Sequence, residues 1–146
     1  YNYLNIGIGY TLPFATFAEE WVDADRLKEV LDSYEVPGVA WRTVHYKPTS
    51  GRLSGKLIHG VQYYYTDYEA ATITLTQFYV MQAVWELYGK NPFVLSAERI
   101  PMFNKVCGTD FVSNTFGQSL KVSDIADFWC ADAETFKRLS AKYYLY

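Results

Sequence analysis

The sequence predicts a single domain of the α+β class, in which several helices pack on an antiparallel or mixed β-sheet. Residues 39–46 and 58–66 alternate β-branched and aromatic side chains as strands do, whereas residues 24–34 and 75–88 repeat apolar side chains at helical spacing. A chain of 146 residues also fits one domain and is long enough to bury a real core.

Composition and charge exclude several classes of function. Half of the residues are hydrophobic and 20% are charged, and no apolar run approaches the ~20 residues of a membrane span. The 13 basic and 16 acidic residues leave a formal charge of −3, which favours neither nucleic acid nor an anionic membrane as a partner. The 14 tyrosines exceed what such a core needs, so we expect several at the surface or at an interface.

The N-terminal residues 1–10 are expected to form an extended segment. Gly7 and Gly9 alternate with apolar residues there, and glycines in a strand usually mark a bulge or the close approach of another backbone or a ligand. Pro13 then turns the chain, because proline cannot donate a backbone hydrogen bond. A partly apolar stretch, residues 14–22, leads into the first helix.

Both long helices carry recognisable end signals. Asp23 is the predicted N-cap of the first helix, and Pro37 and Gly38 end it. The second helix has its apolar side within residues 75–88 and is expected to cover one face of the sheet, with Gly89 as its C-cap.

The last third of the chain is less regular. Prolines interrupt residues 90–110, and a turn at residues 107–110 leads into a further helical piece. Ser123 is expected to cap a later helix. The last helical run is marked by Phe136, Leu139 and Tyr143.

The loop between the two predicted strands is rich in chemically active side chains, and loops held between strands often carry sites. Lys47, Thr49 and Arg52 lie in it, and we expect Tyr46 and the tyrosines at 63–65 to crowd its base. Cations and hydroxyls beside aromatic faces suit a polar, partly anionic, ring-shaped ligand. Lys47 and Arg52 are the best candidates for an anion contact, the alternative being solvated loop charges.

No catalytic arrangement is recognisable. Glycoside hydrolysis needs two facing carboxyl groups ~5 to 10 Å apart, and the acidic residues here suggest no such pair. Cys107 and Cys130 match no metal-ligand or redox spacing and are expected to be free thiols, while His45 and His59 are interpreted as hydrogen-bonded sheet residues. The run 51–56 lacks the glycine spacing of a phosphate loop. We therefore expect no catalytic residue, no metal site and no cofactor.

A series of short motifs follows in a characteristic order over nearly the whole chain. They are Gly7 and Gly9 with Pro13-Phe14; Trp21-Val22-Asp23-Ala24; Pro37-Gly38-Val39; Tyr46-Lys47-Pro48-Thr49; Gly60-Val61-Gln62 with Thr66-Asp67; Gly108-Thr109-Asp110; and Tyr143-Tyr144-Leu145-Tyr146. In this order the chain resembles the C-terminal domain of the NamZ-type exo-β-N-acetylmuramidases, bacterial enzymes that remove terminal N-acetylmuramic acid from peptidoglycan fragments.

The resemblance implies that residues 1–146 are the C-terminal auxiliary domain of a two-domain glycoside hydrolase. In that family an N-terminal Rossmann-like domain carries the proposed catalytic carboxylates, and the C-terminal domain closes the cleft between the two. The implied partners are therefore the N-terminal catalytic domain of the same protein and a peptidoglycan-derived sugar, and the chain alone is expected to be inactive. The implied location is periplasmic or extracellular.

The resemblance also implies that residues such as Gly7, Gly9, Lys47, Thr49 and Gln62 face the cleft or the partner domain. Together with the loop chemistry, the predicted substrate-binding residues are Gly7, Gly9, Tyr46, Lys47, Thr49, Arg52 and Gln62.

One departure from the family concerns the sugar's lactyl carboxylate. The family usually has Arg between the two glycines and Thr after them, whereas this chain has Ile8 and Tyr10. An Arg can bind a carboxylate through two hydrogen bonds, and Ile cannot. Either Lys47 or Arg52 takes that role, or the substrate differs, or the protein binds without cleaving.

Two other functions remain open. In a stand-alone glycan-binding module, Trp41 and the tyrosines at 63–65 stack on sugar rings. In a structural docking domain, the excess tyrosines form a buried interface, and the surface around Tyr46 and Gln62 is covered in the longer protein.

Overall fold

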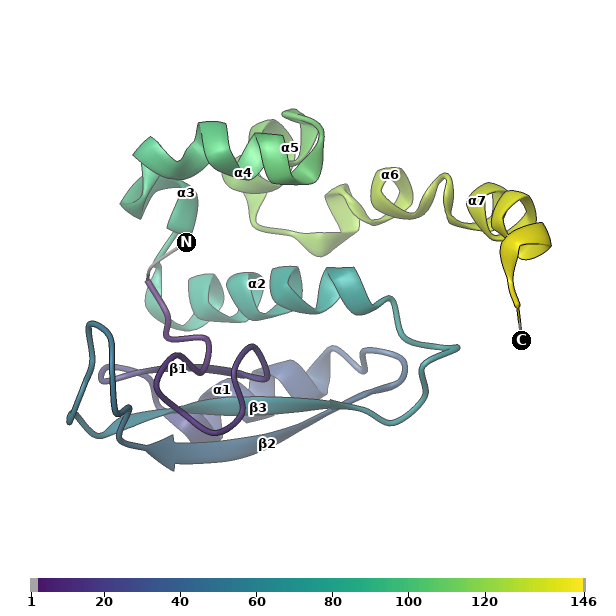
Figure 1. The fold of residues 1–146 in the computed structure, drawn as a ribbon. Helices are drawn as coiled ribbons and strands as arrows, with labels where there is room; N and C mark the ends of the chain where they lie inside the picture. The colour runs from purple at the N-terminus through teal and green to yellow at the C-terminus, as the bar shows by residue number, and fades with distance from the viewer. Residues whose placement is uncertain (1–2, 146) are drawn as a thin grey trace.

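The structure, a computed structural model, describes residues 3–145. Three strands form an antiparallel sheet in the order β1-β3-β2, and helices pack on it, which confirms the α+β prediction (Figure 1). The strands are β1 (Thr16–Glu19), β2 (Val39–Tyr46) and β3 (Ile58–Tyr65). The bounds of β2 and β3 agree with the predicted strands to within one residue.

The central strand, β3, pairs with β2 along its whole length, so opposite residues lie on the same face of the sheet. We call the side that carries Trp41 and Val61 the first face, and the side that carries Tyr46 and Ile58 the second face. The two faces are covered differently, the first by helices and the second by loops.

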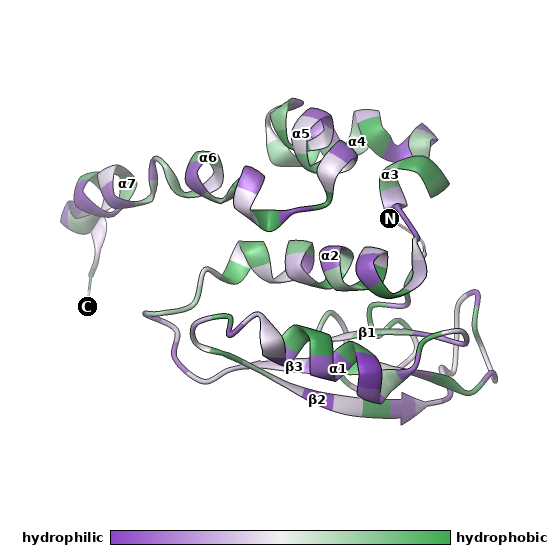
Figure 2. Ribbon diagram, turned by 180° about the vertical axis from the view of Figure 1, so that it is seen from behind, coloured by the Kyte–Doolittle hydropathy of each residue, from purple (hydrophilic) through white to green (hydrophobic). Residues whose placement is uncertain are grey.

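Helices α1 (Ala24–Ser33) and α2 (Thr76–Tyr88) contribute to the core on the first face. The predicted cap is confirmed, because the Asp23 carboxylate accepts hydrogen bonds from two backbone N–H groups of the first turn. The core between helices and sheet holds Leu4, Val22, Leu27, Leu31, Trp41, Val61, Val80, Ala83 and Val84. Seen from behind, α1 crosses the sheet with hydrophobic and hydrophilic residues alternating along it (Figure 2). The helix ends before Pro37, since the chain leaves it at Tyr34.

The second face carries loops in place of helices. The N-terminal loop (residues 3–15) and the β2–β3 loop (residues 47–57) border a small core. Its members are Ala18, Val44, Tyr46, Leu53 and Ile58, with Tyr10 packed against them. Because both loops contribute to a core, they are structural parts of the domain and not loose connections.

Helix α2 separates this half from a second helical half. Its predicted C-cap is confirmed, since Gly89 has a left-handed φ of 61°. Phe78 of α2 is fully buried in a separate core with Phe93 and Phe116, so α2 is apolar on two sides. The remaining helices are η1 (Ile73–Leu75), α3 (Pro92–Leu95), η2 (Ala97–Arg99), α4 (Ile100–Cys107), α5 (Phe111–Ser119), η3 (Val122–Asp124), α6 (Ala126–Cys130), α7 (Ala133–Ser140) and η4 (Ala141–Tyr143).

Two sequence predictions about secondary structure are wrong. Residues 3–10 form turns rather than an extended segment, and only Asn5 makes an isolated bridge, to Ala18; residues 1 and 2 lie outside the described part of the chain. Ser123 does not cap a helix, because it lies inside η3 and α6 begins later without a side-chain cap.

Other sequence predictions concern cysteines, histidines and membrane spans. Cys107 and Cys130 are free and partly buried. His45 and His59 are hydrogen-bonded across the sheet, their Nδ1 atoms 2.7 Å apart, as predicted. Within residues 3–145, no helix has both the length and the apolar character needed to cross a membrane.

Candidate functional site

The N-terminal loop and the β2–β3 loop are joined at Gly9. The Gly9 carbonyl oxygen accepts hydrogen bonds from the backbone N–H of Thr49, at 2.8 Å, and from its hydroxyl, at 3.1 Å. Gly9 has a φ of +79°, and a Cβ there would lie 2.7 Å from the backbone nitrogen of Ser50. This confirms the close approach of another backbone predicted from the glycine pattern. Gly7 serves a turn within its own loop, because its Cβ would lie 2.5 Å from the Leu12 carbonyl oxygen.

An open pocket of about 410 Å³ lies at this junction, lined by Gly9, Tyr10, Thr11, Lys47 and Thr49. Lys47 is exposed and takes part in none of the ion pairs found within residues 3–145. The Thr49 hydroxyl donates to Gly9 and keeps its lone pairs for a ligand donor. The pocket therefore offers the Lys47 cation, the hydroxyl groups of Thr11 and Thr49 and the Tyr10 side chain to a small polar ligand.

Arg52, the other predicted anion contact, is engaged within the domain. Its guanidinium forms an ion pair with Glu19, a carboxylate only 2% exposed at the end of β1. Lys56 pairs in the same way with Glu20 at 2.7 Å. These cations tie the β2–β3 loop to the end of β1 and to the turn after it. Among residues 3–145, therefore, Arg52 has an ion-pair partner and Lys47 has none.

Tyr46 is buried and supports the site from beneath. Its hydroxyl donates to the Asn5 side-chain oxygen at 3.0 Å and lies 3.0 Å from the Thr16 hydroxyl. Its ring stacks on Tyr10 with centroids 4.0 Å apart. Burial raises the pKa of the Tyr46 hydroxyl, so the group stays a proton donor well into the alkaline range. This side chain positions Tyr10 and Asn5 and presents no free face to a ligand.

Gln62 is likewise only 5% exposed and lies on the second face. Its side-chain oxygen accepts two hydrogen bonds from Arg42, at 3.0 and 2.6 Å. The structure therefore brings Gly9, Lys47 and Thr49 together at one open pocket, and places Tyr46, Arg52 and Gln62 in supporting contacts. Whether any of these residues binds a substrate stays a prediction.

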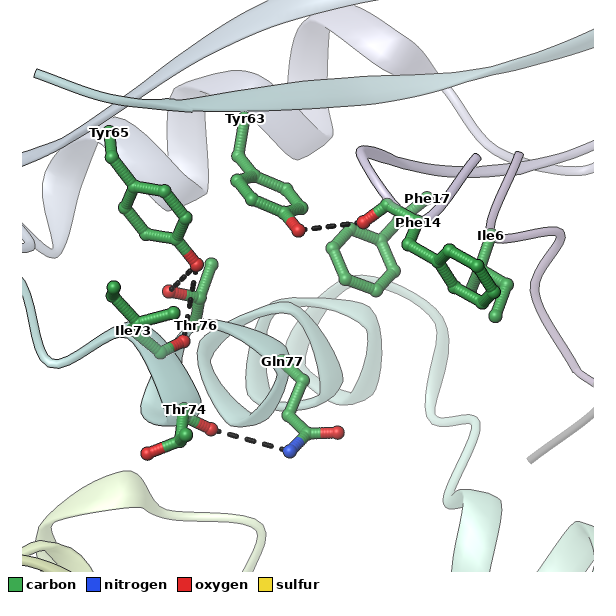
Figure 3. Close-up of a pocket in the computed structure, with 9 residues that line it drawn as sticks. All are labelled: Ile6, Phe14, Phe17, Tyr63, Tyr65, Ile73, Thr74, Thr76 and Gln77. Carbon is green, nitrogen blue, oxygen red and sulfur yellow. Dashed lines mark hydrogen bonds between the residues drawn. The ribbon is translucent and has the colours of Figure 1, made fainter. Parts of the chain in front are cut away.

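A second pocket, of about 270 Å³, lies on the first face between the sheet, the N-terminal loop and the start of α2 (Figure 3). Its lining consists of aromatic, aliphatic and uncharged polar side chains: Ile6, Phe14, Phe17, Tyr63, Tyr65, Ile73, Thr74, Thr76 and Gln77. The Tyr63 hydroxyl donates to the Phe14 carbonyl oxygen at 2.6 Å, and the Gln77 amide donates to the Thr74 carbonyl oxygen at 3.3 Å. None of its lining side chains carries a charge at neutral pH.

The sequence analysis missed this second pocket because it placed the tyrosines at 63–65 beside the loop. The register puts Tyr65 opposite Val39, at the end of β3 that lies farthest from the loop. The strand alternation does predict that Tyr63 and Tyr65 share a face. No sequence signal showed that Phe14, in a left-handed conformation with φ 64°, would line the same pocket.

Trp41 and the tyrosines at 63–65, which a glycan-binding module would use to stack on sugar rings, do not form one exposed aromatic surface. Trp41 is only 6% exposed, and Tyr64 lies on the opposite face from Tyr63 and Tyr65. Among residues 3–145, no group of three or more His, Cys, Asp or Glu side chains is placed to hold a metal ion.

Comparison with known proteins gives consistent results. The family described as "Exo-beta-N-acetylmuramidase NamZ, C-terminal" matches residues 2–146. The peptidoglycan beta-N-acetylmuramidase NamZ of Bacillus subtilis is 28% identical over 140 residues, which are 96% of this chain and 33% of that protein. A crystal structure of a DUF1343 family protein from Bacteroides fragilis matches with a TM-score of 0.89 and 39% identity, over 99% of this chain and 38% of that chain. The chain thus spans about a third of the length of its curated relative.

Proposed function

This chain belongs to the family of C-terminal domains of NamZ-like peptidoglycan hydrolases, and we propose that it closes the substrate cleft of such an enzyme and positions the terminal sugar. The N-terminal domain of the parent protein supplies the catalytic acid and base in this proposal. The domain itself contributes orientation and the exclusion of water, both of which lower the barrier to reaction. Because peptidoglycan lies outside the cytoplasmic membrane, the proposed location is periplasmic or extracellular.

The observation that carries this proposal is the Lys47 ammonium group beside the junction of Gly9 and Thr49, which is in no ion pair within residues 3–145. N-acetylmuramic acid differs from N-acetylglucosamine by its lactyl group, whose carboxylate a nearby cation stabilises. Ile8 cannot provide that contact, and the charge of Arg52 is already matched by Glu19. Of the two cations considered from the sequence, Lys47 is therefore the one we assign to the sugar.

The loop that carries Lys47 is held by contacts at several points, as the positioning of a sugar requires. The β2–β3 loop is held to the N-terminal loop through Thr49, to the end of β1 through Arg52 and to the turn after β1 through Lys56. A cation on such a loop loses less freedom on binding than one on a mobile loop, so more of its interaction energy remains for the ligand. The neutral pocket in Figure 3 borders the same N-terminal loop and suits the uncharged part of the glycan.

The competing function is a glycan-binding module that acts alone. A titration of N-acetylmuramic acid into the isolated chain and into the parent protein separates the two, with N-acetylglucosamine, which lacks the lactyl group, as control. A domain that completes a cleft predicts at least about tenfold tighter binding by the parent, a difference of about 1.4 kcal/mol. Equal affinity in the two proteins contradicts the cleft and supports the module.

A further inference from the structure

Helix α7 and the short helix η4 that follows it present an apolar stripe that nothing within residues 3–145 covers. Phe136, Leu139 and Tyr143 follow one another at i, i+3 and i+7, so they lie on one side of the helical run. They are 70%, 62% and 72% exposed, and α7 has no buried residue. The helix also carries Glu134 and Arg138, and Figure 2 shows hydrophobic and hydrophilic residues along it. An amphipathic helix normally buries its apolar side against other protein, so we expect the apolar side of α7 to have a partner.

The stripe lies at the end of an arm, by which we mean helices α6 and α7. In Figure 1, α6 and α7 extend beyond the start of α2 and away from the sheet. The arm is attached at its base, where the Trp129 ring N–H donates to the Thr74 hydroxyl at 2.7 Å. Farther along, Lys137 reaches Glu69 only at 3.9 Å between exposed side chains. An eight-residue helix is not stable alone in water, so α7 requires further contacts.

We propose that Phe136, Leu139 and Tyr143 dock on the N-terminal part of the parent polypeptide, an inference that rests on the proposed two-domain protein. The Bacteroides fragilis structure aligns with 99% of this chain, the arm included in that span, while 62% of its own chain lies outside the match, since 38% is covered. The Bacillus subtilis relative is likewise matched over only 33% of its length. Both relatives therefore contain a further part of the polypeptide, outside the match, against which α7 can pack.

A second copy of the chain fits the stripe less well. A stable dimer buries roughly 1,200–2,000 Å² in total, and three side chains on a short helix supply less than that. A domain of the same polypeptide needs a smaller contact, because the linkage holds it at an effective concentration in the millimolar range. The size of the stripe therefore favours an intramolecular partner.

Hydrogen exchange of residues 131–145, measured in the isolated chain and in the parent protein, tests this inference. In the parent, docking slows exchange in this segment by at least about tenfold, as burial of a marginal helix does. The variant Phe136→Ser with Leu139→Ser returns the parent to the rate of the isolated chain. The matched control, Glu134→Ser with Arg138→Ser, carries the same number of serines on α7 and leaves the protection in place.

Equal exchange rates in the two proteins overturn the inference. So does a dimer of the isolated chain in sedimentation velocity that the Phe136→Ser, Leu139→Ser variant dissociates, since the occupant is then a second copy. Protection of α7 in a parent that does not bind N-acetylmuramic acid leaves this inference standing and removes the proposed function. If the parent binds N-acetylmuramic acid but α7 is not protected, the proposed function stands and this inference is overturned.

Discussion

Gly9 and Thr49 lie 40 residues apart in the sequence, yet the carbonyl oxygen of Gly9 accepts hydrogen bonds from both the backbone N–H and the hydroxyl group of Thr49. The N-terminal loop and the β2–β3 loop therefore form one unit. The position of Lys47, two residues before Thr49, depends on this contact. Changes at Gly9 should consequently affect both stability and the proposed sugar site.

Replacing Gly9 with Ala should destabilise the domain by more than left-handed strain alone, which is worth about 1–2 kcal/mol for a residue with a Cβ. The added Cβ would also meet the Ser50 backbone, 2.7 Å from its nitrogen and 2.8 Å from its oxygen. Gly55→Ala is the matched control, because Gly55 has a similar φ of +76° and no atom within 4 Å of a Cβ. If both variants lose the same free energy of unfolding in urea, the contact of the added Cβ with the Ser50 backbone has no further cost.

Replacing Arg52 with Gln should lower the free energy of unfolding by about 1–3 kcal/mol, because it leaves the buried Glu19 carboxylate without its partner. Lys56→Gln is the comparison, since Lys56 and Glu20 are about half-exposed and such pairs contribute about 0–1 kcal/mol. Denaturant titration of both variants measures the difference. Similar losses would mean that Arg52 has no special structural role, and that it is as available for a ligand as Lys56.

Alkaline pH should destabilise the domain partly through Tyr46. Burial raises the pKa of this hydroxyl above its ordinary value of 10.0, so the folded state keeps a proton that the unfolded state releases. The resulting stability is fully present below about pH 10 and is lost as pH rises further. Tyr46→Phe should lower stability at neutral pH by about 1 kcal/mol through lost hydrogen bonds, but its stability should fall less steeply above pH 10. Parallel pH profiles for the two proteins would argue against this assignment.

Replacing Lys47 with Ala should separate binding from stability. The side chain is exposed and unpaired among the described residues, so the free energy of unfolding should change by less than about 0.5 kcal/mol. The dissociation constant of N-acetylmuramic acid from the parent protein should rise about tenfold, because a charge-assisted hydrogen bond is lost. Lys121→Ala is the control, because Lys121 is also exposed, lies in the helical half and is in none of the ion pairs within residues 3–145, so its loss should leave that constant unchanged. An unaltered constant in the Lys47 variant would remove Lys47 from the proposed site.

The parts of the fold that the sequence predicts are those encoded by neighbouring residues. Alternation located β2 and β3, a carboxylate before an apolar repeat located the start of α1, and Gly89 located the end of α2. The N-terminal segment shows the limit of such patterns. Its alternating glycines resemble a strand, but Gly7 and Gly9 adopt positive φ angles and turn the chain instead.

The candidate site depends on contacts between distant residues, which a single sequence does not display. Arg52 and Glu19 are 33 positions apart, and each taken alone resembles a solvated charge. Tyr46 resembles a surface aromatic until Asn5 and Thr16 are placed around its hydroxyl. The sequence therefore indicated this loop as a candidate site. The fold adds that Arg52 is ion-paired with Glu19, whereas Lys47 is in none of the ion pairs found within residues 3–145.

The most direct test of the central claim is photo-crosslinking of the parent protein with N-acetylmuramic acid that carries a diazirine on its acetyl group, followed by mass-spectrometric mapping. The account predicts adducts within the N-terminal loop and at residues 47–49, suppressed by excess unlabelled sugar and reduced in the Lys47→Ala variant. Adducts found only outside residues 1–146 would show that this domain does not contact the terminal sugar, and would contradict the account.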